Sequence, residues 1–272
     1  MPRNTAIIAL TLVSGGVLFG ALAAHRSASN AEPALKTTKM KAGRAPVIVE
    51  LFTSEGCSSC PSADALLAKL KRDQPVGGAE VIALSEHVDY WNSRAWADPY
   101  SAAAFSARQE AYRKNLRLDS VYTPQMIVDG HAEFVGSDDD RAASAIAQAA
   151  KTAKTNVDLT GGIKDNSLLL RIKIASVTGL AAGEKADTML AITEDNLHSQ
   201  VAGGENSGRR LNHAAVVREL KNLGAATKSG GLETAFALPL KSNWKRGDLQ
   251  AVVFVQAQNS KRILGSAAIQ VK

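Results

Sequence analysis

The two cysteines of this chain, Cys57 and Cys60, are separated by two serines and are the residues best suited to chemistry. A thiolate is the nucleophile in disulfide exchange, and a helix N-terminus stabilises negative charge through its free N–H groups and its dipole. The sequence predicts a helix that begins at or near Cys57, because apolar residues recur at helical spacing in Ala63, Leu66, Leu67 and Leu70. Cys57 is therefore the predicted attacking sulfur, at the exposed start of the helix. Cys60, about one turn further on, is the predicted resolving thiol.

The elements around the cysteines fit this interpretation. An apolar, β-branched run at 47–52 predicts a buried strand, residues 53–56 predict a turn, and Pro61 falls in the first helical turn, where a missing N–H is tolerated. The same motif is also compatible with a structural disulfide or with two inert thiols. A zinc site would need a second pair of good ligands, and haem attachment would need a histidine in place of Pro61.

A second predicted strand, at 79–84, is followed by a polar and aromatic loop at 85–91. If the two strands are parallel, this loop lies near Cys57, because the carboxyl ends of parallel strands share one edge of a sheet. His87 is then a candidate proton shuttle that Asp89 could orient, or a structural histidine bonded to backbone. Tyr90 and Trp91 form either a substrate-facing lip or a small satellite core.

The next stretch predicts a helix over 101–116, a strand over 125–128 and a helix ending near Lys154. Between them, Asp129-Gly130 is a hairpin turn signal that leads into a strand at 133–135. Thr123-Pro124 comes directly before the strand at 125–128, and proline is tolerated at the first residue of a strand.

From Asn156 onward the pattern changes to short alternating strands separated by Gly, Asn and Ser clusters, which is typical of a β-sandwich. The predicted strands are 167–175, 187–193, 215–220, 232–238, 249–257 and 263–271. The glycine-rich segment 201–213 is interpreted as an interdomain or structural loop, with an acidic-ligand site as the alternative. His198 and His213 lack a third clear ligand, so no metal site is predicted.

The N-terminus reads as an export signal. Residues 1–24 combine Arg3 with a mostly apolar run and nearby small-residue cleavage sites, which predicts a signal peptide, with an uncleaved anchor as the alternative. Residues 25–45 form a basic linker. Residues 1–44 hold six basic residues and one acidic residue, so the remaining 228 residues carry only +1 of the total charge of +6. This distribution argues against a nucleic-acid partner.

Several stretches together resemble known proteins: ELFTSEGCSSCPSAD, SEHVDYWN, RQEAYRKN, VYTPQMIVDG and GENSGRRLNHAAVVR. The order of elements over 46–152 resembles the thioredoxin superfamily. More narrowly, the motifs resemble a secreted proteobacterial family of unknown function that is catalogued as thioredoxin-like. The resemblance implies that Cys57 is the nucleophile, Cys60 the resolving thiol and Pro124 a cis-proline beside them, with Thr123 shaping a substrate groove. It does not imply a direction of redox chemistry, because Ser58-Ser59 differs from the dipeptides of thioredoxin and of periplasmic oxidants.

The sequence therefore predicts an α/β thioredoxin-like domain over 46–154, followed by an all-β sandwich-like domain over 155–272. The predicted activity is thiol–disulfide exchange on protein or peptide thiols in the periplasm or outside the cell, without a bound cofactor. The predicted partners are the thiol substrate and a protein that recycles the pair, with membrane contact only through an uncleaved N-terminal segment. Two alternatives remain: a non-catalytic binding or assembly module with a structural disulfide, and a protein that captures a soft metal such as Cu(I) through its thiolates.

Overall fold

The computed structural model describes residues 36–37 and 43–271. The chain divides into two units, Met1–Glu32 and Pro33–Lys272, and all described residues belong to the second. The predicted leader at 1–24 and nearly all of the linker at 25–45 lie outside the described residues. Within the described residues, no helix has the length and hydropathy needed to cross a bilayer.

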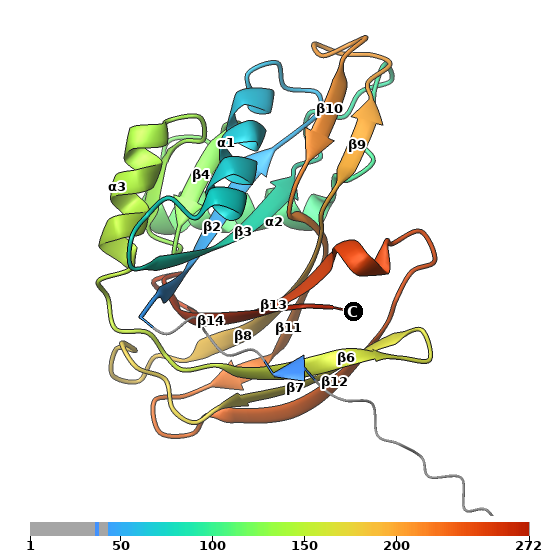
Figure 1. Ribbon diagram of the computed structural model, residues 1–272. Helices are drawn as coiled ribbons and strands as arrows, with labels where there is room; N and C mark the ends of the chain where they lie inside the picture. The colour runs from blue at the N-terminus through green and yellow to red at the C-terminus, as the bar shows by residue number, and fades with distance from the viewer. Residues whose placement is uncertain (1–35, 38–42, 272) are drawn as a thin grey trace, which may run out of the picture. The chain divides into compact units, whose positions relative to one another are not determined.

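The described part of the chain is mixed α/β, with few helices and mostly strands (Figure 1). The helices are α1 (Cys60–Asp73), α2 (Ala103–Leu116) and α3 (Asp139–Ala149), with a short 3₁₀ turn at Arg246–Asp248. The strands are β1 (Lys36–Thr37), β2 (Ala45–Thr53), β3 (Ala79–His87), β4 (Gln125–Val128), β5 (Ala132–Val135), β6 (Asp158–Lys164), β7 (Ser167–Ile174), β8 (Ala186–Glu194), β9 (Leu197–Gln200), β10 (Arg210–His213), β11 (Val216–Ala226), β12 (Leu232–Pro239), β13 (Leu249–Ala257) and β14 (Ile263–Gln270).

Eight of these strands form one sheet, in the order β14-β13-β8-β11-β3-β2-β4-β5. β2 and β3 are parallel neighbours, and Thr53 at the end of β2 is paired with His87 at the end of β3. The sheet continues across the predicted domain boundary at 154–155, because β11 pairs in parallel with β3 through Val216 and Ser85. The two predicted domains thus share a backbone-paired sheet, and their separation into domains stays a prediction.

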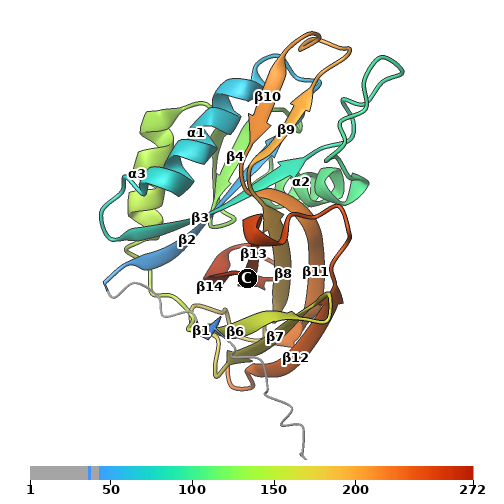
Figure 2. The ribbon, with the colours of Figure 1, turned by 45° about the vertical axis from the view of Figure 1, so that its right-hand side comes forward.

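Helices cover both faces of the N-terminal half of this sheet (Figure 2). One face of β2, β3 and β4 packs against α1 and α3 in a buried cluster that includes Leu51, Leu67, Met126 and Ile146. The opposite face packs against α2, where Phe105 shares a cluster with Ile48, Leu84 and Phe254. Because these strands are buried on both faces, their sequences are mostly apolar instead of alternating, and the buried Glu50 and Glu86 within them contact Arg108.

The C-terminal half of the large sheet faces a second sheet, in the order β1-β6-β7-β12. β13 shows how one strand serves two cores. Its residues Leu249, Val253 and Val255 point into the cluster shared with β6 and β7. Val252 and Phe254, on the other face, join the cluster under α2. β9 and β10 form a separate two-stranded hairpin.

The Asp129-Gly130 turn is confirmed, and the predicted C-terminal strands are confirmed with end shifts of one residue or none, except that the strand predicted at 215–220 extends to Ala226 as β11. Asp129 and Gly130 have φ angles of 46° and 72° and are the two central residues of a turn closed by His131 N and Val128 O, within a three-residue connection between β4 and β5. Strands β6, β9 and β10 were not predicted, because glycines and polar residues interrupt their apolar pattern.

Two boundaries predicted near the cysteines are wrong. The helix begins at Cys60 and not at Cys57, since residues 54–59 form successive turns with Cys57 N bonded to Ser54 O and Cys60 N to Cys57 O. The strand predicted at 79–84 extends to His87, so His87 belongs to β3 and not to a loop.

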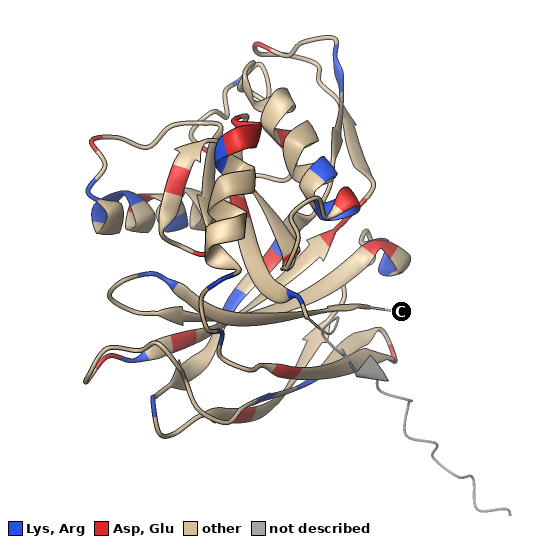
Figure 3. Cartoon of the chain, turned by 60° about the vertical axis from the view of Figure 1, so that its left-hand side comes forward, with Lys and Arg blue, Asp and Glu red and all other residues tan. Residues whose placement is uncertain are grey.

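Basic and acidic residues are both spread along the described chain. In Figure 3, blue and red segments occur on helices, strands and loops.

Candidate functional site

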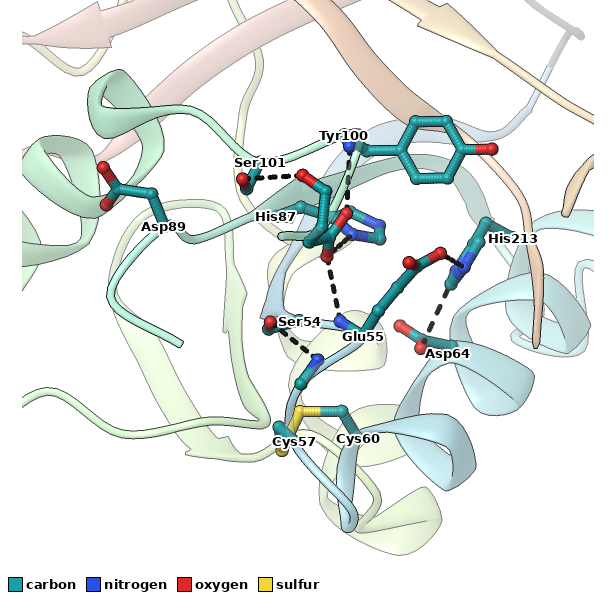
Figure 4. A network of polar contacts seen from close by, with 12 residues as sticks. Ser54, Glu55, Cys57, Cys60, Asp64, His87, Asp89, Tyr100, Ser101 and His213 are labelled. Atoms are coloured by element: carbon teal, nitrogen blue, oxygen red, sulfur yellow. Dashed lines mark hydrogen bonds and ion pairs between the residues drawn. A yellow bond between two sulfur atoms is a disulfide. The ribbon is translucent and has the colours of Figure 1, made fainter. Parts of the chain in front are cut away.

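The centre of the candidate site is the disulfide between Cys57 and Cys60, whose Cα atoms are 5.4 Å apart (Figure 4). β2 ends at Thr53, the turns follow, and Cys60 is the first residue of α1. The prediction that Cys57 is exposed is wrong: Cys57 and Cys60 are 1% and 0% exposed. Only Ser58 and Ser59, between them, face solvent.

The hairpin of β9 and β10 brings a distant segment onto this turn. The side-chain amide of Asn206 donates hydrogen bonds to the backbone oxygens of Glu55, at 2.9 Å, and of Cys57, at 2.8 Å. The carboxylate of Glu205 accepts from the backbone N–H of Ser58 at 2.9 Å. Asn206 is fully buried. The segment predicted to be an interdomain or structural loop thus contacts the cysteine turn directly.

Pro124 and Thr123 lie on the neighbouring strand end. The Thr123–Pro124 peptide bond is cis, as predicted, and Pro124 is buried. Its carbonyl accepts from Gly136 N at 2.9 Å, and a Cβ placed on Gly136 would lie about 3.1 Å from both Pro124 and Ala63 of α1. Pro124 therefore lies close to the first turn of the cysteine helix.

The aromatic residues of the 88–100 loop have separate roles. Trp91 packs against the small cluster of Phe52, Val88, Tyr112 and Ile127. Its indole N–H donates to Thr123 Oγ1 at 2.7 Å, and its backbone lies against Gly56. Tyr90 is 46% exposed and donates to Gln109. Trp91 thus matches the satellite-core interpretation, whereas Tyr90 stands at the surface.

His87 is fully buried, and its partner is Asp98 at a distance of 2.7 Å. The prediction that Asp89 could orient His87 is wrong. Asp89 bonds to Ser106 on α2 and points away from His87 in Figure 4. The reason is that β3 continues through His87, so side chains 87 and 89 are carried by different elements.

A second histidine completes this network from the C-terminal half. His213 Nε2 lies 2.9 Å from Glu55 Oε1, and the indole of Trp96 donates to Glu55 Oε2 at 3.1 Å. Because a carboxylate only accepts, Nε2 of His213 carries the hydrogen and Nδ1 faces Asp64, 3.9 Å away. The rings of His87 and His213 pack edge to face with centroids 4.9 Å apart.

Burial and pairing set the electrostatics of this network. Burial acts to lower the pKa of His87, but the charge and hydrogen bond of Asp98, together with the nearby carboxylates of Asp64 and Glu55, raise that pKa overall. Burial acts to raise the pKa of Asp98, but the charge and hydrogen bond of His87, together with two backbone hydrogen bonds, lower that pKa overall. Asp64, on α1 one turn after Cys60, has its pKa raised by burial. Asp64 Oδ1, His87 Nε2 and His213 Nδ1 have no hydrogen-bond partner among the described residues.

Sequence reasoning missed Glu55, Asp64, Asp98, Asn206 and the site role of His213. Glu55 and Asp64 flank the cysteine pair within one sequence motif, and this proximity could have identified them as candidate site residues. Asp98 and His213 join the site only because their loop and hairpin fold back onto β2 and β3, and periodicity carries no information about such contacts.

A second buried charge cluster lies under α2. Arg108 contacts Glu50 at 2.6 Å and Glu86 at 3.4 Å, and Tyr112 donates to Glu50. Burial raises the pKa of Glu86 well above its usual range. Gln256 of β13 also bonds to Arg108, so this cluster ties α2 to both halves of the large sheet. No group of three or more His, Cys, Asp or Glu residues within 36–37 and 43–271 is arranged to hold a metal ion.

The fold and site define a mixed α/β protein with a buried disulfide at a strand-to-helix turn and a network of acid–histidine pairs to one side of it. The chain belongs to a family described as "Protein of unknown function (DUF1223)", whose profile matches residues 48–256.

Two solved structures are similar over most of the chain. One is a structural genomics crystal structure of a protein from Agrobacterium tumefaciens, at 25% identity and a TM-score of 0.62, covering 85% of this chain and 96% of that one. The other is HBP35 of Porphyromonas gingivalis, at 15% identity and a TM-score of 0.58, covering 85% of this chain and 77% of that one. No curated protein matches the sequence.

Proposed function

We propose that this protein is an exported thiol–disulfide oxidoreductase that acts on protein or peptide thiols through Cys57 and Cys60. The observation that carries the proposal is the Cys57–Cys60 disulfide at the end of a parallel strand and the start of a helix. Asp64, one turn after Cys60 on α1, and the buried pair His87–Asp98 supply titratable groups near it. Proton acceptors of this kind are what thiol chemistry requires.

The fold proposed for residues 46–154 is thioredoxin-like, followed by a sandwich-like domain at 155–272. Support comes from the element order β2-α1-β3-α2-β4-β5-α3, with α1 and α3 on one face of the strands and α2 on the other. Further support comes from Pro124, which is buried at the start of β4 beside α1.

In the reductive direction, the Cys57 thiolate attacks one sulfur of a substrate disulfide, and the other substrate sulfur leaves as a thiolate. The Cys60 thiolate then attacks Cys57 Sγ, forms the internal disulfide and releases the second substrate thiolate. Two electrons pass from the protein dithiol to the substrate, and two protons are taken up by the thiolate products. A dithiol partner then reduces the internal disulfide, and the oxidative direction is the reverse of these steps.

A second function is a non-catalytic binding or assembly module that uses the disulfide only as a structural cross-link. The burial of both cysteines favours it, because a labile, reactive pair is ordinarily accessible.

The reduction potential separates the two functions. The purified protein is equilibrated in glutathione buffers, and free thiols are counted by the mass added on alkylation, with Cys57→Ser and Cys60→Ser as single-thiol controls. A potential above about −250 mV, together with disulfide exchange on a peptide substrate, supports the oxidoreductase. A potential below about −300 mV marks a structural disulfide and rejects it.

A further inference from the structure

The loop at 201–209, here called the cap, contacts the backbone of the cysteine turn from the C-terminal half of the chain. It joins β9 to β10 and approaches residues about 150 positions earlier in the chain, as the separation of 149 between Asn206 and Cys57 shows. The cap also rests on the 93–96 turn, since a Cβ on Gly203 would lie 2.2 Å from the backbone oxygen of Ala95. The cysteine turn is thus enclosed by a segment that is not part of its own strand–helix unit.

The bonds that the cap makes are those that a peptide backbone would make. Asn206 offers N–H donors to two carbonyls of the turn, Glu55 O and Cys57 O. Glu205 offers an oxygen acceptor to the N–H of Ser58, the residue between the cysteines. An extended peptide also presents N–H donors and C=O acceptors in alternation, so it can satisfy the same three groups.

The cap is held in this arrangement by its own contacts. Arg209 donates to Asn206 Oδ1 at 2.7 Å, which fixes the amide with its nitrogen toward the cysteine turn. Val201 N bonds to Arg209 O and Gly208 N to Val201 O, closing the base of the loop. Among the described residues, its hydrogen bonds to the backbone of residues 55–58 are the three described above, and Glu205 also bonds to the side chain of Ser58.

The cap is the tip of a two-stranded hairpin. Among the described strands, β9 and β10 pair with each other and with neither of the larger sheets. Gly204 and Gly208 have φ angles of 75° and 79°, which glycine adopts without steric cost. At the base, His213 anchors β10 to Glu55, so the tip can swing while the hairpin stays attached.

We propose that the cap is an intramolecular competitor of the substrate: it occupies the backbone groups of the cysteine turn, and an extended peptide segment beside a substrate cysteine displaces it. This inference rests on the proposed function and adds the substrate class, an unfolded or flexible segment. It also accounts for a disulfide that is only 1% and 0% exposed in the capped state. Attack on Cys57 Sγ then requires the cap to open.

The first test is the rate at which excess dithiothreitol reduces the disulfide of the full-length protein at pH 7, followed by alkylation and mass shift. Asn206→Ala removes both donors, and Asn206→Asp replaces the amide by an acceptor of the same shape. Loss of two ordinary hydrogen bonds increases the open fraction, and with it the rate, by about 10- to 30-fold. Asn156→Ala is the matched control, since Asn156 is exposed and bonds only to Asp158 among described side chains. It is expected to react at the wild-type rate.

The second test leaves the cap sequence unchanged. Cys60→Ser protein is trapped as a mixed disulfide between Cys57 and a cysteine-containing peptide carrying an activated sulfur. Hydrogen exchange is then compared with the untreated variant, and residues 201–209 are expected to exchange at least about tenfold faster in the trapped form. A glutathione adduct has a much shorter backbone, so residues 201–209 are expected to exchange more slowly in it than in the peptide adduct.

The proposal is overturned if both Asn206 variants are reduced within about twofold of the wild-type rate. It is also overturned if the trapped peptide leaves cap exchange unchanged. Neither measurement depends on turnover. If the potential lies below about −300 mV but the Asn206 variants are reduced faster, the oxidoreductase function is rejected and the cap still covers the disulfide. If the potential lies above about −250 mV but the Asn206 variants react at the wild-type rate, the function is kept and the role of the cap is rejected.

Discussion

Removal of the Glu55 carboxylate is predicted to destabilise the oxidised protein strongly. Glu55 is fully buried and accepts hydrogen bonds from His213 Nε2 and from the indole of Trp96. Glu55→Ala leaves the histidine donor without this acceptor at a buried position. Leaving the buried His213 unpaired lowers the free energy of unfolding by more than the intact Glu55–His213 pair contributed to it.

The magnitude follows from these two contacts. A hydrogen bond to a charged group contributes about 1.5–3 kcal/mol, and the half-buried indole of Trp96 recovers part of its loss from water. The free energy of unfolding should therefore fall by about 3–5 kcal/mol in Glu55→Ala. Glu55→Gln keeps the shape and one acceptor oxygen, so its loss should be about 1–2 kcal/mol.

The assay is equilibrium urea unfolding at 25 °C, with the m-value checked for two-state behaviour. Glu233→Ala is the control, because its side chain is 76% exposed and its ion pair with Lys173 is 3.6 Å long. It should change stability by less than about 0.5 kcal/mol. In the double variant Glu55→Ala/His213→Ala, the free energy of unfolding should fall by at least about 1 kcal/mol less than the two single-variant decreases added together. A Glu55→Ala loss below about 1 kcal/mol, or strict additivity, would refute the reasoning.

Three further outcomes can be checked. The folded-state pKa of His87 is raised, so its contribution to stability is fully present below about pH 6.5 and is lost as the pH rises through the folded pKa; His87→Gln should flatten the decline seen by urea unfolding between about pH 6 and 8.5. Glu205→Gln removes a carboxylate next to the cysteine turn, so alkylation of Cys57 in the reduced protein should speed up about two- to fivefold at low salt, with the difference shrinking in 1 M NaCl. Gly203→Val cannot keep its contact with Ala95, so the disulfide should be reduced faster by dithiothreitol than in wild type, and an unchanged rate would show that this contact does not hold the cap.

Much of the local structure near the cysteines could be predicted, because its signals lie close together in the chain. The apolar run of β2, the helical spacing of Leu66, Leu67 and Leu70, and the Asp129-Gly130 turn each identify an element from a few neighbouring residues. The start of α1 was displaced by three residues, since the successive turns at 54–59 compete with helix at its N-terminus.

The exposure of Cys57 could not be predicted in the same way. Placement at the start of a helix indicates an accessible sulfur only when nothing else packs on that end of the helix. Asn206, about 150 residues later, makes two hydrogen bonds to the turn, and its glycine-rich segment carries no local mark of a binding partner.

The sequence by itself determined the residue types capable of thiol chemistry and the strand and helix that carry them. The tertiary structure alone decided which acids meet which histidines, because Asp98 reaches His87 and His213 reaches Glu55 through folding back of a loop and a hairpin. It also decided that one sheet joins the two halves, since the β3–β11 pairing links strands about 130 residues apart. Local propensity acts over a few neighbouring residues, whereas burial and charge pairing depend on distances in space that only the packed chain defines.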